Sequence, residues 1–87
     1  MSTPHPARAI EFEWDENNED KLAERNILPS DVEYVWANRP KYERNKNTGS
    51  ATWRMTGKDR GGRTLRIGIR WADERERRLR AIYAWPV

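Results

Sequence analysis

The stretch Thr64-Leu65-Arg66-Ile67-Gly68-Ile69-Arg70-Trp71 decides the fold, because apolar and polar residues alternate along its whole length. Alternation at period two is typical of a β-strand with one buried and one solvated face. We expect the leucine, the two isoleucines and the tryptophan to face a core. The threonine, the glycine and the two arginines then face outward. Such a strand needs neighbouring strands and a layer that covers its apolar side.

Segments on both sides of this stretch have the same pattern. Residues 51–57 place Trp53 and Met55 opposite Arg54, and residues 59–62, with two glycines, predict a hairpin turn. Residues 41–45 predict a weaker edge strand. Residues 77–85 predict the last strand, with one set facing the core and the other facing outward: Leu79, Ala81, Tyr83 and Trp85 against Arg78, Arg80, Ile82 and Ala84.

The first part of the chain predicts one strand and two helices. Residues 9–14 alternate as a half-buried strand, and Asp15 is a suitable N-cap for a helix that ends near residue 26. Ser30 and Glu33 have the spacing of a capping box, which predicts a second helix. The apolar stripe of that helix is expected to consist of Val32, Val35 and Trp36.

These elements predict an α+β fold in the order β-α-α-β-β-β-β. Both helices are expected on one face of an antiparallel sheet, and the other face is expected to be open to water. Residues 1–8 contain two prolines and no periodic pattern, so we expect a flexible tail there. Residues 9–87 are expected to form a single domain.

Charge is distributed unevenly along the chain. Residues 9–36 hold nine acids and two bases, a net charge of −7, whereas residues 37–87 hold fourteen bases and five acids, a net charge of +9. This asymmetry favours a polyanionic partner for the basic part, most often a nucleic acid.

Several kinds of site and location are disfavoured by composition. The chain has no cysteine, which excludes disulfides and cysteine–zinc sites, and its one histidine, His5, argues against histidine-pair ribonuclease chemistry. No metal or other cofactor is expected. No apolar run approaches the roughly 18 residues of a membrane span, so we expect a cytoplasmic protein without a membrane partner.

Alternation also predicts where the arginines lie. If the apolar residues face the helices, Arg54, Arg66 and Arg70 share the open face, and Arg78 or Arg80 joins them. Guanidinium groups bind phosphate oxygens in a bidentate manner, so this face could hold an RNA backbone and stabilise charge during cleavage. The alternative is a solvated polar face without a task, which the small number of nearby carboxylates disfavours. A shift of one residue in register would exchange the two faces.

Several stretches in sequence order carry a family resemblance: Phe12-Glu13-Trp14-Asp15-Glu16-Asn17-Asn18, Lys21-Leu22-Ala23, Ile27-Leu28-Pro29-Ser30-Asp31-Val32-Glu33, Arg54-Met55-Thr56-Gly57-Lys58-Asp59-Arg60-Gly61-Gly62-Arg63-Thr64-Leu65 and Arg80-Ala81-Ile82-Tyr83-Ala84. Together they resemble the BrnT family of toxins, which are similar to the RelE-type ribonucleases of type II toxin–antitoxin systems. The resemblance spans about residues 9–85.

The resemblance implies a RelE-like fold, metal-independent cleavage of RNA by its own 2′-oxygen, and neutralisation by a cognate antitoxin that commonly also binds DNA. Lysine, arginine and tyrosine supply proton transfer and charge stabilisation in such enzymes. The candidate catalytic residues here are Lys21, Arg25, Arg54, Arg66, Arg80 and Tyr83. The candidate RNA-binding residues are Arg54, Arg66, Arg70 and Arg78.

The chain departs from the family after the first expected helix. Where the family has a basic residue, a histidine and a glycine, this chain has Glu24-Arg25-Asn26. Asparagine tolerates the left-handed conformation that ends many helices, so the backbone turn can be retained without glycine. The imidazole is lost, which leaves open two further hypotheses. One is a catalytically degenerate module that binds nucleic acid or protein without cleavage, and the other is a subunit whose basic face meets an acidic protein.

Overall fold

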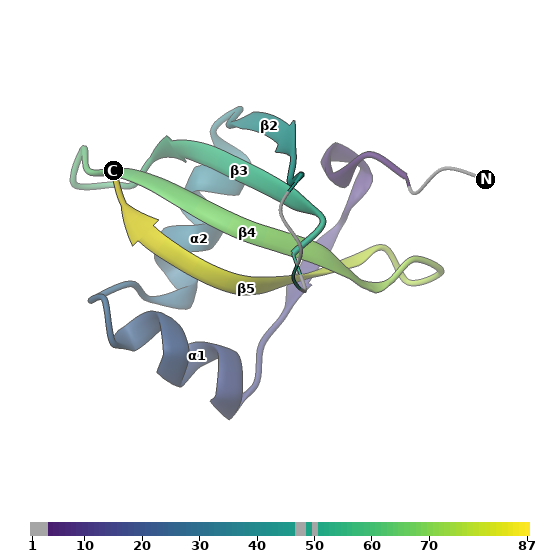
Figure 1. Ribbon diagram of the computed structural model, residues 1–87, viewed down its shortest axis with the longest axis horizontal. Helices are drawn as coiled ribbons and strands as arrows, with labels where there is room; N and C mark the ends of the chain where they lie inside the picture. The colour runs from purple at the N-terminus through teal and green to yellow at the C-terminus, as the bar shows by residue number, and fades with distance from the viewer. Residues whose placement is uncertain (1–3, 47–48, 50) are drawn as a thin grey trace.

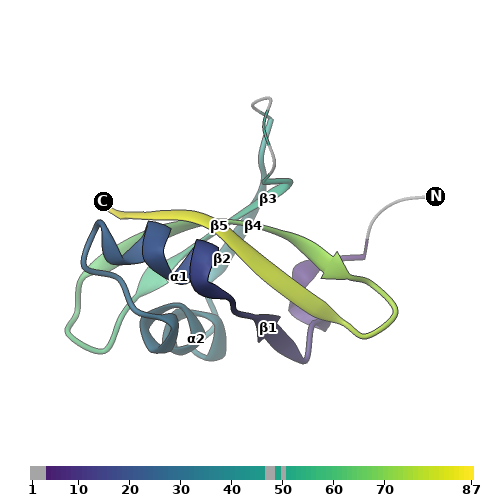
Figure 2. The same cartoon turned by 90° about the horizontal axis from the view of Figure 1, so that it is seen from below.

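The computed structural model describes residues 4–46, 49 and 51–87, in which two α-helices pack on a five-stranded mixed sheet (Figure 1). The elements are a short 3-10 helix η1 (Pro6–Arg8), β1 (Glu11–Glu13), α1 (Glu16–Ala23), α2 (Pro29–Ala37), β2 (Lys41–Arg44), β3 (Trp53–Lys58), β4 (Thr64–Asp73) and β5 (Arg78–Pro86). The strands lie in the sheet in the order β1-β5-β4-β3-β2. Figure 2 shows α1 and α2 on the same side of the sheet, as expected.

The sheet is mixed because β1 runs parallel to β5, with Glu11 opposite Arg78 and Glu13 opposite Arg80. The prediction of an antiparallel sheet is therefore wrong for this pair and correct for the other pairs. After β1 the chain passes through both helices and enters the sheet at the far edge. The meander from β2 to β5 then returns to β1 in the parallel direction.

Local hydrogen bonds define the first helix. Asp15 accepts a bond from the backbone amide of Asn18 at 3.0 Å, and the Asn18 side chain accepts one from the amide of Asp15 at 2.8 Å. This reciprocal pair is a capping box, so Asp15 is the N-cap that the sequence predicts. Asn26 has a φ of 58°, which confirms the expected left-handed turn after α1.

The second helix begins differently from the prediction. Pro29 is its first residue, and the Leu28 amide donates a hydrogen bond to the Asp31 carboxylate at 2.8 Å. The predicted capping box of Ser30 and Glu33 is wrong, because proline suits the first helical position and moves the start two residues earlier. Glu33 instead accepts a hydrogen bond from Trp14 Nε1 at 2.7 Å.

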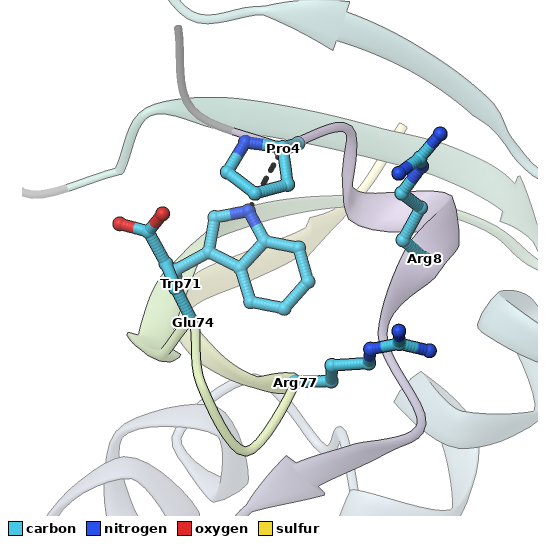
Figure 3. Close-up of a pocket in the computed structure, with 5 residues that line it drawn as sticks. All are labelled: Pro4, Arg8, Trp71, Glu74 and Arg77. Atoms are coloured by element: carbon cyan, nitrogen blue, oxygen red, sulfur yellow. Dashed lines mark hydrogen bonds between the residues drawn. The ribbon is translucent and has the colours of Figure 1, made fainter. Parts of the chain in front are cut away.

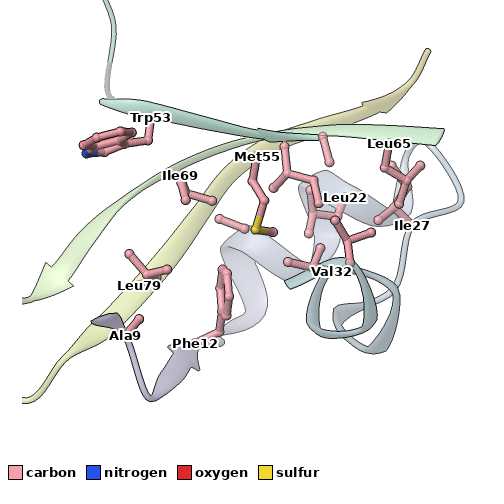
Figure 4. Packing of buried hydrophobic residues seen from close by; sticks show 14 residues of the cluster. Ala9, Phe12, Leu22, Ile27, Val32, Trp53, Met55, Leu65, Ile69 and Leu79 are labelled. Atoms are coloured by element: carbon pink, nitrogen blue, oxygen red, sulfur yellow. The ribbon is translucent and has the colours of Figure 1, made fainter. Parts of the chain in front are cut away.

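The core lies between the helices and the sheet (Figure 4). Leu22 of α1 and Val32 and Val35 of α2 are buried against apolar side chains of the strands. The strand residues in this cluster are Phe12, Trp53, Met55, Leu65, Ile67, Ile69, Leu79, Ala81 and Ala84. The predicted core faces of β3 and β4 and the predicted stripe of α2 are confirmed, with Trp36 packed at the margin.

A bulge in β5 changes which of its side chains face the core. Ile69 lies opposite Ala81, yet the preceding Gly68 lies opposite Tyr83, so Ile82 is an extra residue. After Ile82, the residues that alternation predicts for the core face lie on the open side, and those predicted for the open side face the helices. Ala84 is buried on the helix side, and Tyr83 and Trp85 lie on the open side, opposite to the prediction.

Residues 4–8, part of the stretch expected as a flexible tail, pack against the sheet. Pro6 is fully buried, and the His5 ring contacts the rings of Tyr42 and Trp53 at centroid distances of 4.9 and 4.8 Å. The Nε1 of Trp71 donates a hydrogen bond to the Pro4 carbonyl at 2.8 Å. Within the described ranges, no helix combines the length and apolar character that crossing a bilayer requires.

Candidate nucleic-acid interface

The open side of the sheet, away from the helices, carries a set of arginines that we call the arginine face. Its members come from β3, β4 and β5. Residues directly opposite each other on neighbouring strands point to the same side of a sheet, so the pairing assigns each side chain to a face. One row across the strands contains Arg54, Gly68 and Tyr83, and the next contains Thr56, Arg66 and Trp85. A further row pairs Arg70 with Arg80.

The centre of the arginine face is basic and carries unused hydrogen-bond donors. Among the described residues, Arg66 and Arg70 form no ion pair. The Nε atoms of Arg54 and Arg66 are buried and have no partner in the described part of the chain, and neither has the hydroxyl of Thr56. Buried polar atoms normally have a partner, and these three have none among the described residues and lie beneath the surface of the face, whereas the remainder of each guanidinium is the part that a ligand can reach.

The rim of the arginine face is acidic, which corrects the expectation of few nearby carboxylates. Arg80 bonds Asp15 through two nitrogens, at 2.8 and 3.1 Å, and Glu13 at 3.0 Å. Looser pairs join Arg78 to Glu11 at 3.6 Å and Arg54 to Glu43 at 3.8 Å. The acids come from the edge strands and the turn after β1, and the unexpected pairing of β1 with β5 brings three of them beside the arginines.

The pair of Asp15 and Arg80 shifts the titration of both groups. The hydrogen bond from the Arg80 side chain, with the backbone amide of Asn18, holds the pKa of Asp15 below its ordinary value. The hydrogen bond to Asp15 in turn raises the pKa of Arg80, although partial burial opposes the shift. At neutral pH Asp15 is therefore ionised and engaged, and Arg80 has a fixed position at the rim.

A hollow of about 230 Å³ adjoins this pair between α1 and β5. Three cationic side chains, Lys21, Arg70 and Arg80, line it. Asn17, Asn18, Ala81 and Ile82 complete the lining. The structure thus brings together Lys21 and Arg80 from the candidate catalytic set with Arg70 from the candidate binding set. A phosphate group is an appropriate occupant for a hollow with this charge.

The other candidate residues lie outside that hollow. Arg25 is exposed in the turn after α1, and Arg78 lies on β5 near its start and pairs with Glu11. Arg54 and Arg66 lie on the central rows of the arginine face. Tyr83 shares this face with Arg80, because the bulge at Ile82 moves Tyr83 to the open side, where Arg80 already lies.

Sequence reasoning missed the aromatic pair on this face. The rings of Tyr83 and Trp85 are parallel, with centroids 4.6 Å apart and planes 9° apart, and both residues are partly exposed. Gly68 lies directly beneath, and any side chain there would overlap the Tyr83 ring. A glycine inside a strand often marks a place where another group approaches the backbone closely. Gly68 is therefore the residue from which a contact at this position could have been predicted.

A metal site and a second hollow are the two other places where a ligand could be sought. No group of three or more histidine, cysteine, aspartate or glutamate side chains suited to a metal ion occurs among the described residues. A second hollow of about 380 Å³ is lined by Pro4, Arg8, Trp71, Glu74 and Arg77 (Figure 3). Its tryptophan lies on the helix side of the sheet by register, so this hollow is separate from the arginine face.

Comparison of the chain with protein-family models, with curated proteins and with solved structures finds no match.

Proposed function

We propose that this chain is a BrnT-like toxin of a type II toxin–antitoxin system, with a RelE-like arrangement, and that it acts on RNA through the arginine face. One observation carries the RNA part: Arg66 and Arg70 lie at the centre of a solvated sheet face without a carboxylate partner among the described residues. The toxin part rests on the motif resemblance along residues 9–85 and on the element order that it implies.

In this proposal the RNA backbone follows the central rows of the arginine face. Arg66 and Arg70 hold phosphates through their guanidinium groups. The acidic rim of Glu11, Glu13 and Glu43 repels the backbone at both edges of the sheet and keeps it on the central strands.

The scissile phosphate occupies the hollow lined by Lys21, Arg70 and Arg80. The RNA 2′-oxygen attacks the adjacent phosphorus, the bond from phosphorus to the 5′-oxygen breaks, and the products are a 2′,3′-cyclic phosphate and a 5′-hydroxyl end. The two arginines stabilise the charge that develops on the phosphate oxygens. Lys21 lines the hollow and is the candidate that passes a proton from the 2′-hydroxyl to the leaving 5′-oxygen, whereas Tyr83 lies outside the hollow.

The test uses the purified protein with labelled RNA at several salt concentrations. Wild type should bind with a steep salt dependence, and Arg66→Ala and Arg70→Ala should each reduce the slope of log K against log salt by about 1. Arg75→Ala is the matched control. Arg75 is exposed in the turn before β5, away from the central rows, and its substitution removes the same charge. Equal effects of all three variants would contradict a specific face.

Cleavage is tested on the same RNA with one 2′-deoxy nucleotide at the cut site. The substitution should abolish cleavage and leave binding intact, because the attacking oxygen is missing. In cells, expression should arrest growth, and Arg66→Ala should relieve the arrest. Cleavage that persists at the 2′-deoxy position would overturn the proposed reaction.

One observation favours a second candidate, the degenerate module that binds RNA without cutting it. Arg80 is engaged by two carboxylates, and His5, the only imidazole of the chain, packs against Tyr42 and Trp53 away from the hollow. RNA that is bound with steep salt dependence yet remains intact would establish this candidate. An absence of nucleic-acid affinity at low salt would remove both and leave the hypothesis of an acidic protein partner.

A further inference from the structure

The Tyr83–Trp85 pair is partly exposed on the arginine face and lies outside the core. In the apolar cluster of the described residues, β5 contributes Leu79, Ala81 and Ala84 but neither of these aromatic side chains. The two rings instead stack on each other at 4.6 Å, and Tyr83 is seated over Gly68. The β5 bulge therefore places two large aromatic rings on the open side of the sheet, at the β5 end of the rows that contain Arg54 and Arg66.

We infer that the Tyr83–Trp85 pair is a stacking site for an unpaired nucleobase, so that the chain selects single-stranded RNA over duplex RNA. The inference rests on the proposed function and specifies its substrate class. Bases stack on exposed aromatic rings with little dependence on sequence, because every base has a π-face. A duplex covers both faces of each base with neighbouring pairs, so only an unpaired base can reach these rings.

The rings are fixed before any ligand binds. They are parallel within 9°, so a base can add to the stack as a third layer in the same orientation. Tyr83 is held from below by the Gly68 backbone, which leaves no room for the ring to move toward the sheet. A preorganised site of this kind loses little conformational entropy when the ligand binds.

The neighbouring arginine supplies the other half of a nucleotide site. Arg66 lies directly opposite Trp85, and such pairs have Cβ atoms about 4.5–5.5 Å apart. One nucleotide can therefore place its base on the rings and its phosphate on the Arg66 guanidinium.

The experiment measures binding of three probes: a short adenine-only RNA, an RNA duplex, and inorganic polyphosphate. Wild type should prefer the single strand to the duplex. Trp85→Ala should weaken binding of the single strand by about 5- to 150-fold, the range expected for loss of one stacked base. It should leave polyphosphate binding unchanged, and Trp85→Phe should retain most of the affinity.

Tyr34→Ala is the matched control, because Tyr34 is a partly buried aromatic of α2 that lies under Arg60 on the helix side. It should bind all three probes like wild type. Arg66→Ala should weaken all three probes, which tests the proposed function separately from the stacking site.

The outcomes separate the two claims. If Trp85→Ala keeps the affinity for the single strand, or loses affinity for polyphosphate to the same extent, the stacking site is overturned while the effect of Arg66→Ala still supports RNA binding. Equal affinity of wild type for duplex and single strand would also overturn it. If Arg66→Ala changes no probe, the proposed function fails as well. The thermal unfolding midpoint of each variant identifies any loss that results from misfolding.

Discussion

Gly68→Ala is the perturbation that tests how tightly the Tyr83 ring is seated on the sheet. The new methyl group would occupy the position of the ring, so the ring or the strand must shift. Overpacking of this kind costs about 1–3 kcal/mol, and alanine regains about 0.5–1 kcal/mol because it has less backbone entropy to lose than glycine. We expect the free energy of unfolding to fall by roughly 1–2 kcal/mol.

A double-mutant cycle with Tyr83→Ala isolates the contact between the two residues. Once the ring is removed, the three atoms nearest to the methyl group at position 68 are gone, and Gly68→Ala should then stabilise the protein by about 0.5–1 kcal/mol. The coupling energy should be about 1–3 kcal/mol, because residues in contact are not additive.

Urea unfolding of the four proteins supplies these values from the midpoint and slope of each transition. A slope that stays constant across the set would show that the denatured state is unchanged. Additivity within about 0.5 kcal/mol would refute the seated ring, and with it the preorganised stacking site.

Three further predictions concern the core, the caps and the rim. Leu65→Ala should lower the free energy of unfolding by about 2–5 kcal/mol in urea, because the side chain is fully buried. Asp31→Ala should cost about 1 kcal/mol and Ser30→Ala less than about 0.5 kcal/mol, since Asp31 and not Ser30 bonds the start of α2; equal losses would contradict this start. The lowered pKa of Asp15 means that its pair with Arg80 stabilises the fold above the unfolded pKa of about 4 and that this contribution is lost as the pH falls through the folded pKa. The stability difference between wild type and Asp15→Asn should therefore be constant above about pH 5 and shrink as the pH falls below about 4, and a difference that stays constant down to the lowest pH would argue against the pair.

The presence of the strands could be predicted from the sequence, because it depends on the alternation of apolar and polar residues within each strand. The pattern from Leu65 to Ile69 fixes two faces by itself, and the core faces of β3 and β4 follow from it. The α1 cap at Asp15 and the left-handed Asn26 are also local, since each depends on hydrogen bonds or backbone angles within a few residues.

The features that the sequence did not predict depend on distant partners. Ile82 is as apolar as its neighbours, so nothing in its own composition marks it as the bulged residue, and the reversed faces of Tyr83 and Trp85 follow from it. The engagement of Arg80 depends on Glu13 and Asp15, which are more than sixty residues away in the chain. Their proximity results from the pairing of β1 with β5, and a three-residue strand has too little pattern to specify its partner.

The parallel pairing of β1 with β5 also determines when the molecule can be completed during synthesis. Residues 11–13 leave the ribosome long before residues 78–80, and the strand that lies between β1 and β4 is the last to emerge. Until then the nascent chain has β1 without a neighbour, Asp15 without its arginine, and the Gly68 backbone uncovered by Tyr83. Closing so long a loop is slow compared with forming local hairpins, so the arginine face is assembled only after β5 has been translated.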